Sequence, residues 1–127
     1  MVKLTVTQKM ARKAIESTYV GVCTIMERRD VRDEETKITR KNEEVAVVED
    51  QPCRLSFEKL HAVVQTETVA KQTQGTKLFI APEIAVRPGS KIIVQQNGVT
   101  TQYIASGMPA VYFSHAEIML ELSKGWV

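Results

Sequence analysis

The stretch KLFIAPEIAVRPGSKIIVQQNG, residues 77–98, decides the fold that we predict from this sequence. It contains two apolar runs, 78–80 and 92–94, and a short alternating piece, 84–86, between them. Proline and glycine separate these pieces at Pro82, Pro88, Gly89, Asn97 and Gly98. β-Branched runs bounded by Pro and Gly are typical of strands joined by tight turns. Because the stretch contains no catalytic motif, we expect a small β-domain that acts through its surfaces.

The bulk composition indicates one ordinary globular domain. The chain has 127 residues, of which 43% are hydrophobic and 25% charged, with a net charge of +2. That total gives no reason to expect a nucleic-acid-binding protein. The charge distribution is uneven, because residues 1–41 carry ten Lys/Arg against six Asp/Glu, whereas residues 42–58 carry five acids against one base, Arg54. Such polarity suits head-to-tail packing of copies or a charged partner, although a solvated charged surface explains it equally.

The cysteines and the apolar runs bear on compartment and metal binding. Cys23 and Cys53 form no CxxC pair and have no clustered histidine, so we predict buried free thiols and no metal site. With no signal peptide in view, two such cysteines indicate a reducing compartment. No stretch approaches the roughly 20 apolar residues that cross a bilayer, so we expect no membrane partner.

A short amphipathic helix is expected over residues 5–18. Met10, Ala11, Ala14, Ile15 and Thr18 share one face at helical spacing. A capping box that begins at Thr7 is incomplete, because Met10 stands three residues later. We expect the apolar face to pack against the sheet or a neighbouring copy.

The alternation of residue types predicts strands joined by polar turns. Pro52 argues for a sheet edge or a bulge between two separate strand pieces. Asn97-Gly98 is the strongest hairpin signal. Turns are expected at 27–35, around Asn42 and at 106–109, and strands at 19–26, 36–39, 44–50, 53–57, 78–80, 92–94, 100–105 and 118–122.

Between the predicted strands lies a long polar segment, residues 58–76, with weak periodicity and no proline. Nearly 20 residues without clear structure inside a small domain are usually functional or disordered. One interpretation is an ordinary helix or insertion. The other is a mobile loop that becomes ordered when it meets a partner.

Catalytic chemistry is not indicated by any group of residues. Ser114, His115 and Glu117 suggest nucleophilic catalysis by type, but neighbours on a strand point to opposite faces, which is the wrong geometry for a Ser–His pair. No phosphate-binding glycine motif occurs. We therefore predict no enzyme, no catalytic residue and no cofactor. His115 is interpreted as a hydrogen-bonded structural residue or an interface residue, and Trp126 is expected to dock on this core or on a neighbouring copy.

The ordered set of short features resembles one known family. LFIAPEIAVRPGSKIIVQQNGVTTQYIASGMPAVYFSHAEIMLELSKGW (residues 78–126), preceded by ESTYVGVCTI (16–25) and QPCRLSFEKL (51–60), resembles head-closure, or stopper, proteins of tailed bacteriophages and prophages, also called head–tail connector or minor capsid proteins. The helix region and the charged residues 27–44 match this pattern least.

The resemblance implies a small β-barrel that assembles as a ring of about twelve copies in the virion. The ring would bind portal or adaptor proteins on one side and tail or tail-terminator proteins on the other, after assembly in the bacterial host cytoplasm. The loop 58–76 would point into the channel and hold packaged double-stranded DNA. Its gate residues would be His61, Val64, Gln65, Thr68, Lys71, Gln72 and Gln74. Interface candidates are Arg12, Glu44, Arg54, His115, Glu117 and Trp126.

Two other functions remain open. One is a tail-completion or tail-terminator component with a similar barrel. The other is a single-strand nucleic-acid-binding module with an OB-like barrel, which needs aromatic and basic side chains together on one strand face. The sequence places few Lys or Arg beside its aromatic residues.

Overall fold

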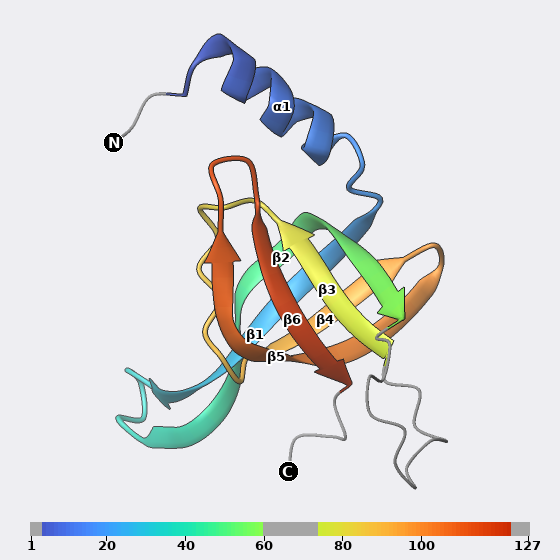
Figure 1. The fold of residues 1–127 in the computed structure, drawn as a ribbon. Helices are drawn as coiled ribbons and strands as arrows, with labels where there is room; N and C mark the ends of the chain where they lie inside the picture. The colour runs from blue at the N-terminus through green and yellow to red at the C-terminus, as the bar shows by residue number, and fades with distance from the viewer. Residues whose placement is uncertain (1–3, 60–73, 123–127) are drawn as a thin grey trace, which may run out of the picture.

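The computed structural model describes residues 4–59 and 74–122, which form one helix and a closed six-stranded β-barrel (Figure 1). Every neighbouring pair of strands is antiparallel, in the order β1-β2-β3-β6-β5-β4 around the barrel. The predicted fold class, a small β-barrel with a short N-terminal helix, is confirmed. The elements are α1 (Val6–Glu16), β1 (Gly21–Arg32), β2 (Thr39–Lys59), β3 (Gln74–Ile80), β4 (Lys91–Gln96), β5 (Val99–Val111) and β6 (Ala116–Leu122).

The core consists of the alternate side chains that point into the barrel. Ile25, Leu78, Ile80, Ile92 and Ile118 are almost completely buried, and they come from four strands. Strand alternation places one side chain in two inside the barrel, as the apolar runs of the sequence predict. The predicted hairpin between β4 and β5 is also confirmed, because Asn97 and Gly98 both have positive φ and Gln96 pairs with Val99.

Gly21 lets the barrel close where β1 begins. It stands between Gln96 of β4 and Cys53 of β2, and a Cβ at Gly21 would lie 3.1 Å from Gln96 Oε1. The Gln96 side chain crosses this position to the backbone of Leu55, whose N–H donates to Gln96 Oε1 at 2.8 Å. Gln96 Nε2 donates in return to the Leu55 carbonyl at 3.4 Å. A side-chain amide thus joins two strands that β1 separates.

Cys23 and Cys53 are buried free thiols, as predicted. A hydrogen bond with Cys53 and burial raise the pKa of the Cys23 thiol well above its ordinary value. The Cys23 thiol therefore remains protonated in the core.

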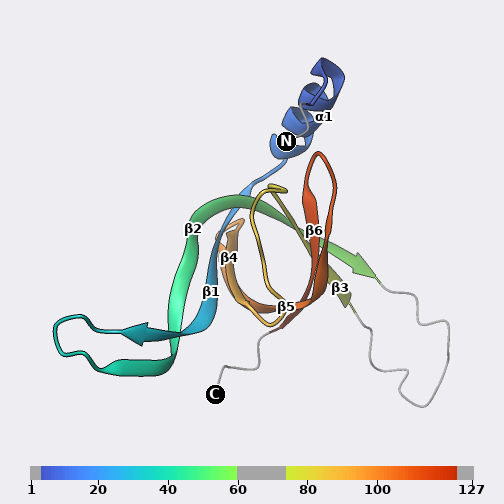
Figure 2. The same ribbon diagram turned by 90° about the vertical axis from the view of Figure 1, so that its left-hand side faces the viewer.

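The charged residues 27–32 are a strand, so the turn predicted at 27–35 is wrong for them. The turn lies at 34–36, and the strand predicted at 36–39 is wrong except at Thr39, where β2 begins. β1 continues to Arg32 and pairs with β2 as a two-stranded arm that projects from the barrel (Figure 2). Opposite charges face each other there, with Arg28 opposite Glu44 and Arg29 opposite Glu43. Both faces of the arm are solvated, so no apolar alternation marks it in the sequence.

β2 is one long strand, whereas the sequence suggests pieces separated by turns. Asn42 lies inside β2 with φ of 56°, so the turn expected there is an irregularity within the arm. Asp50 has φ of 51° at the register shift that precedes Pro52. Both interpretations of Pro52 are therefore confirmed: it follows the bulge at Asp50, and its side that faces away from β1 is a local edge, because pairing with β3 begins at Cys53.

Two further local predictions fail. Residues 84–86 are not a strand; they belong to the connection from β3 to β4, from which Val86 points into the core. Residues 106–109 are not a turn, because they lie within β5, where Gly107 has φ of 76° at a register shift. Gly and Pro mark a bulge here as readily as a turn.

The N-cap of the helix lies two residues before Thr7, the position at which the sequence suggested an incomplete capping box. Thr5 is the N-cap, its hydroxyl accepts from Gln8 N at 3.1 Å, and the Gln8 side chain accepts from Thr5 N at 2.9 Å. The capping box is therefore complete with Gln8 in place of Glu.

The long segment predicted at 58–76 has narrower limits. Glu58 and Lys59 belong to β2, and residues 74–76 belong to β3, where Lys59 pairs with Gln74. The remainder, 60–73, lies outside the described residues.

Candidate functional site

The outer wall of the barrel carries a registered row of functional side chains. Arg54 of β2 is opposite Phe79 of β3, which is opposite Glu117 of β6. Each alternates with buried neighbours such as Leu55, so the row faces outward. Three segments far apart in the sequence thus contribute to one surface.

α1 lies over this wall without burying any of its residues. Arg12 connects the helix to the barrel, because its guanidinium pairs with Glu83 in the β3–β4 connection and with Glu16 at 3.2 Å. Arg12 lowers the pKa of the Glu83 carboxyl. Val6 and Met10 remain 75% and 67% exposed. The predicted packing of the apolar helix face is therefore only partial.

His115 is hydrogen-bonded at both ring nitrogens. Nε2 lies 2.8 Å from Glu117 Oε2, and Nδ1 lies 2.8 Å from Ser114 Oγ. Since a carboxylate only accepts, Nε2 donates to Glu117 and Nδ1 accepts from the Ser114 hydroxyl. The ring also stacks on Tyr112, with 5.1 Å between the centroids. These contacts hold the imidazole rigidly against the wall.

The Ser–His contact corrects one sequence argument. Ser114 precedes β6 instead of lying in a strand, so its hydroxyl reaches the ring of the next residue. Ser114 is only 4% exposed. Its hydroxyl orients the His115 ring, and it does not line the cleft described below.

Glu117 connects the histidine to a lysine. Its Oε1 lies 3.5 Å from Lys77 Nζ on the neighbouring strand. The hydrogen bond from His115, assisted by the charge of Lys77, lowers the pKa of the Glu117 carboxyl.

Arg54 has a different environment. Its Cζ lies 4.7 Å from the ring centroid of Phe79, a cation–π contact. Its Nε is buried and has no hydrogen-bond partner. Tyr19, at the end of the helix connection, likewise has a buried hydroxyl without a partner, and burial raises the pKa of that phenol.

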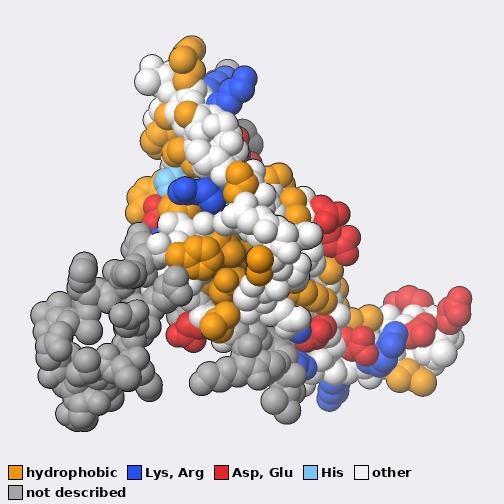
Figure 3. Space-filling view, turned by 90° about the vertical axis from the view of Figure 1, so that its right-hand side faces the viewer, with side chains coloured by type: hydrophobic (Ala, Val, Ile, Leu, Met, Phe, Trp, Pro, Cys, Tyr) orange, Lys and Arg blue, Asp and Glu red, His pale blue; other side chains and the backbone are white. Residues whose placement is uncertain are grey.

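These side chains line a cleft of about 270 Å³ between α1 and the wall, which we call the helix cleft. Figure 3 views the side of the molecule on which the helix rises above the barrel, with hydrophobic and basic side chains near the junction. The lining residues are Ala14, Ile15, Thr18, Arg54, Phe79 and His115.

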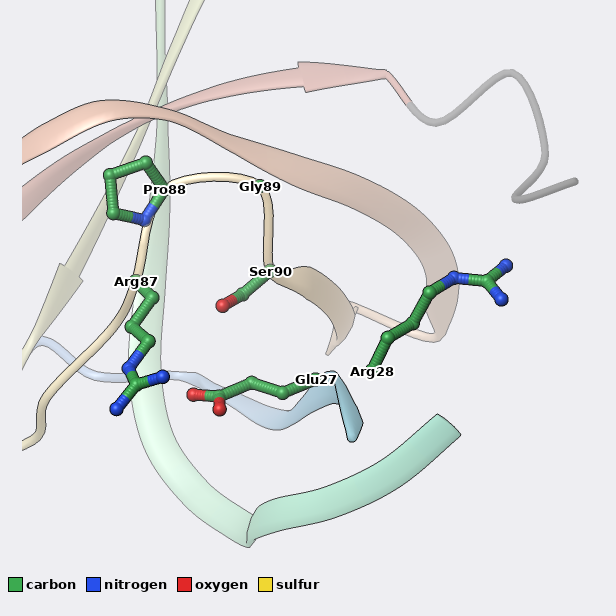
Figure 4. Close-up of a pocket in the computed structure, with 6 residues that line it drawn as sticks. All are labelled: Glu27, Arg28, Arg87, Pro88, Gly89 and Ser90. Atoms are coloured by element: carbon green, nitrogen blue, oxygen red, sulfur yellow. The ribbon is translucent and has the colours of Figure 1, made fainter. Parts of the chain in front are cut away.

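A second depression, of about 280 Å³, lies at the turn before β4 and is called the turn pocket (Figure 4). The side chains of Glu27 and Arg87 point toward each other across it, while Arg28 points away. Ser90 has a buried hydroxyl without a partner. Because acid and base face each other here, the turn pocket favours neither sign of ligand charge.

The barrel mouth forms a third surface, of different character. Phe57, Val99 and Leu122 occupy inward-facing positions at the ends of their strands, yet they are 53%, 61% and 67% exposed. Strand directions put them at the same end as the pair Lys59 and Gln74. This end of the barrel therefore presents apolar side chains to solvent.

The structure gathers four of the six predicted interface residues around the helix cleft: Arg12, Arg54, His115 and Glu117. Glu44 is elsewhere, on the arm, where its carboxylate lies 3.2 Å from Lys91 Nζ. Gln74 begins β3. The other predicted site residues lie outside the described residues: His61, Val64, Gln65, Thr68, Lys71, Gln72 and Trp126.

Sequence reasoning missed Phe79 and Tyr19 as members of the site. Phe79 sits between the buried Leu78 and Ile80, so the run reads as core although its middle residue faces outward. Within residues 4–59 and 74–122, no group of three His, Cys, Asp or Glu side chains is placed to hold a metal ion. In the same residues, no helix is long and apolar enough to span a membrane.

Comparison with known proteins leaves the family open. The chain matches no model of a protein family and none of the curated proteins. Among solved structures it is similar to the phage-like element PBSX protein xkdH from Bacillus subtilis, at 16% sequence identity and a TM-score of 0.49. That alignment covers 81% of this chain and 93% of the other. A likeness at this level assigns no function.

Proposed function

We propose that this chain is a virion structural protein of a tailed bacteriophage or prophage, acting in head closure at the head–tail connector. The observation that carries the proposal is the way in which the family-like sequence features fall on the barrel. LFIAPE contains the end of β3, SKIIV leads into β4, and AEIMLEL is β6. The expected barrel with a long connection between two of its strands is the fold found.

The connection between β2 and β3 supports a gating role. β2 and β3 are neighbours in the barrel, and Lys59 and Gln74 are paired at its mouth. Residues 60–73 therefore leave and re-enter the barrel at one point. In a ring of copies with their mouths toward the axis, these segments would meet over the DNA channel. Their composition is polar and nearly uncharged, which suits contact with DNA without tight phosphate binding.

The outer surfaces supply contacts for assembly. A closed barrel offers few free sheet edges, so copies and partners meet at walls and projections. The arm carries acidic and basic side chains (Figure 3). The helix cleft is lined by Arg54, whose buried Nε has no hydrogen-bond partner among the described residues. Two different surfaces on one chain favour head-to-tail contacts between copies, and such contacts can close into rings. Portal or adaptor proteins and tail proteins would bind the two faces of such a ring.

A deletion in assembled particles tests the gate. Removing residues 64–73 keeps β3 intact and should leave the barrel folded, with DNA escaping from filled heads. The measurement is DNA retention in purified heads. Met108→Ser, at the other end of the barrel, serves as the control and should retain DNA. Heads that keep their DNA after the deletion would contradict the gate.

Location separates head closure from the alternative of a tail-completion component. Electron microscopy of labelled, DNA-filled heads that carry no tail should show the protein at the portal vertex. Label on separately purified tails, and none on such heads, would favour the alternative.

One observation favours the rival single-strand nucleic-acid binder. Arg54 over Phe79, beside His115, places basic and aromatic groups on one strand face, a combination that the sequence did not reveal. Oligonucleotide binding at about 150 mM salt that weakens in Arg54→Met would support this rival.

A further inference from the structure

Among the described residues, the guanidinium of Arg54 has no acidic partner, whereas the charges around it are paired. Arg12 pairs with Glu16 and Glu83, and Lys77 pairs with Glu117. Arg54 instead lies on Phe79, with its Nε buried and without an acceptor. A cation that is partly removed from water and unpaired is unfavourable, and an incoming anion relieves that cost.

The carboxylates nearest to the cleft are already engaged. Glu16 belongs to Arg12, and Glu117 is held by His115 and Lys77. Neither lines the helix cleft. An anion in the cleft would therefore meet Arg54 and, among the residues that line the cleft, no competing acid.

The walls of the cleft are apolar. Ala14 and Ile15 come from the helix, and the rings of Phe79 and His115 come from the barrel. The centroids of these two rings are 5.4 Å apart. A volume of about 270 Å³ is near the lower end of the range for ligand pockets. This cavity suits a side chain with an apolar body better than a large hydrated anion.

The charge in the lining of the cleft favours an acidic partner. Ala14 and Ile15 of α1 and Thr18 just after it carry no charge, and Arg54 is the charged side chain among the residues that line the cleft. The helix is held by the Arg12 contacts and buries no residue, so little packing has to change when a chain enters beneath it. Charge complementarity therefore selects an acidic segment.

We propose that the helix cleft binds an acidic residue of a partner polypeptide, with an adjacent apolar or aromatic side chain against Phe79 and the helix. The carboxylate takes hydrogen bonds from Arg54, and the neighbouring side chain displaces water from the apolar walls. This inference does not depend on the role in head closure, because it concerns one pocket of the isolated chain.

Two matched peptides test the proposal on the full-length protein: acetyl-Glu-Phe-amide and acetyl-Gln-Phe-amide. Binding is followed by NMR shifts of the backbone amides of Arg54, Phe79 and His115. The glutamate peptide should bind at least about tenfold more tightly, because the glutamine oxygen can still accept from Arg54 but carries no negative charge to strengthen the bond. Arg54→Met should remove this preference, whereas Arg87→Met, in the turn pocket, should leave it unchanged.

Thermal unfolding tests whether Arg54→Met still folds. Removing an unpaired cation should leave the melting temperature unchanged or raise it, unlike the loss of a structural ion pair. Equal affinities for the two peptides, an unchanged preference in Arg54→Met, or no shifts up to roughly 10 mM peptide would overturn the proposal. Preferential binding of a single-stranded oligonucleotide, lost in Arg54→Met, would also overturn it in favour of a nucleic-acid site.

Discussion

The helix cleft and the barrel mouth are built from the same strands and yet present opposite chemistry. On β2, Arg54 faces outward into the cleft, and Phe57, three residues later, faces inward at the mouth. The cleft has a cation, Arg54, between apolar walls. The mouth has exposed apolar side chains, those of Phe57, Val99 and Leu122. One alternating pattern therefore produces two different surfaces.

The difference shows what strand position contributes to function. Near the middle of a strand, inward residues are covered and outward residues can be selected for charge. At the strand end, the barrel no longer covers inward residues, and an apolar residue that reads as core becomes surface. The cleft should thus discriminate ligands by their charge. The mouth should instead be covered by an apolar group, and the contact should be stronger the more apolar area it buries.

The largest expected effect comes from a substitution in the barrel core, which supports both the helix cleft and the barrel mouth. Leu78 lies between Leu55 and Ile118 in the register and is fully buried. Leu78→Ala should lower the free energy of unfolding by about 2–5 kcal/mol, because it leaves a cavity in the core. Urea unfolding measures the loss. Met119→Ala, on the exposed side of β6, is the control. Similar losses in both variants would show that Leu78 does not belong to the core.

The next effect concerns the mouth. Trp126, the only tryptophan, lies four residues beyond Leu122, a reach of about 13 Å for an extended chain. We expect it to cover the mouth, so Trp126→Ala should cost about 2–3 kcal/mol in unfolding free energy or weaken assembly.

Tryptophan fluorescence reports directly on that contact. The wild-type emission should be that of a shielded indole, and Phe57→Ser should shift it toward the emission of an exposed one. Met108→Ser, at the other end of β5, should not. Emission typical of free tryptophan in the wild-type protein, together with an unchanged melting temperature for Trp126→Ala, would refute a covered mouth.

A smaller effect is expected where the barrel closes beside the mouth. Gln96→Leu keeps the apolar bulk but leaves the Leu55 N–H without its acceptor across Gly21. The unfolding free energy should fall by about 1–3 kcal/mol, the cost of a buried unsatisfied donor. Hydrogen exchange at the Leu55 amide should also accelerate. Gln95→Leu, on the exposed face of β4, should leave that amide protected.

The sequence predicted the elements whose pattern is local and apolar. The 78–80 and 92–94 runs, the Asn97-Gly98 hairpin and the 118–122 strand all emerged from alternation and turn chemistry. The arm did not, because solvent covers both faces of a two-stranded ribbon and its stability comes from pairs such as Arg28 opposite Glu44. Gly107 and Pro52 were ambiguous because bulges use the same residues as turns.

The candidate site was only partly predictable for a related reason. Arg12, Arg54, His115 and Glu117 stood out by residue type, but their proximity depends on register across β2, β3 and β6. Phe79 was hidden inside an apolar run. Tertiary packing decides whether an outward-facing residue contacts a helix or solvent, and local sequence patterns do not predict that packing.

The smallest expected effect is a dependence of stability on pH, which substitutions in the charged wall should show and substitutions in the apolar mouth should not. His115 and Lys77 lower the pKa of Glu117, so its contribution to stability is present above the ordinary carboxyl pKa of about 4.3 and is lost as the pH falls through the lowered value. Glu117→Gln should therefore cost about 0.5–1 kcal/mol of unfolding free energy at pH 7 and almost nothing near about pH 2.

Glu121→Gln, on the same strand, is the control. Urea unfolding at both pH values measures the difference, and an equal cost for Glu117→Gln at both would show that packing, not charge, holds His115 to the wall. The cost of Phe57→Ser should be the same at both pH values, because no charge of the mouth residue titrates.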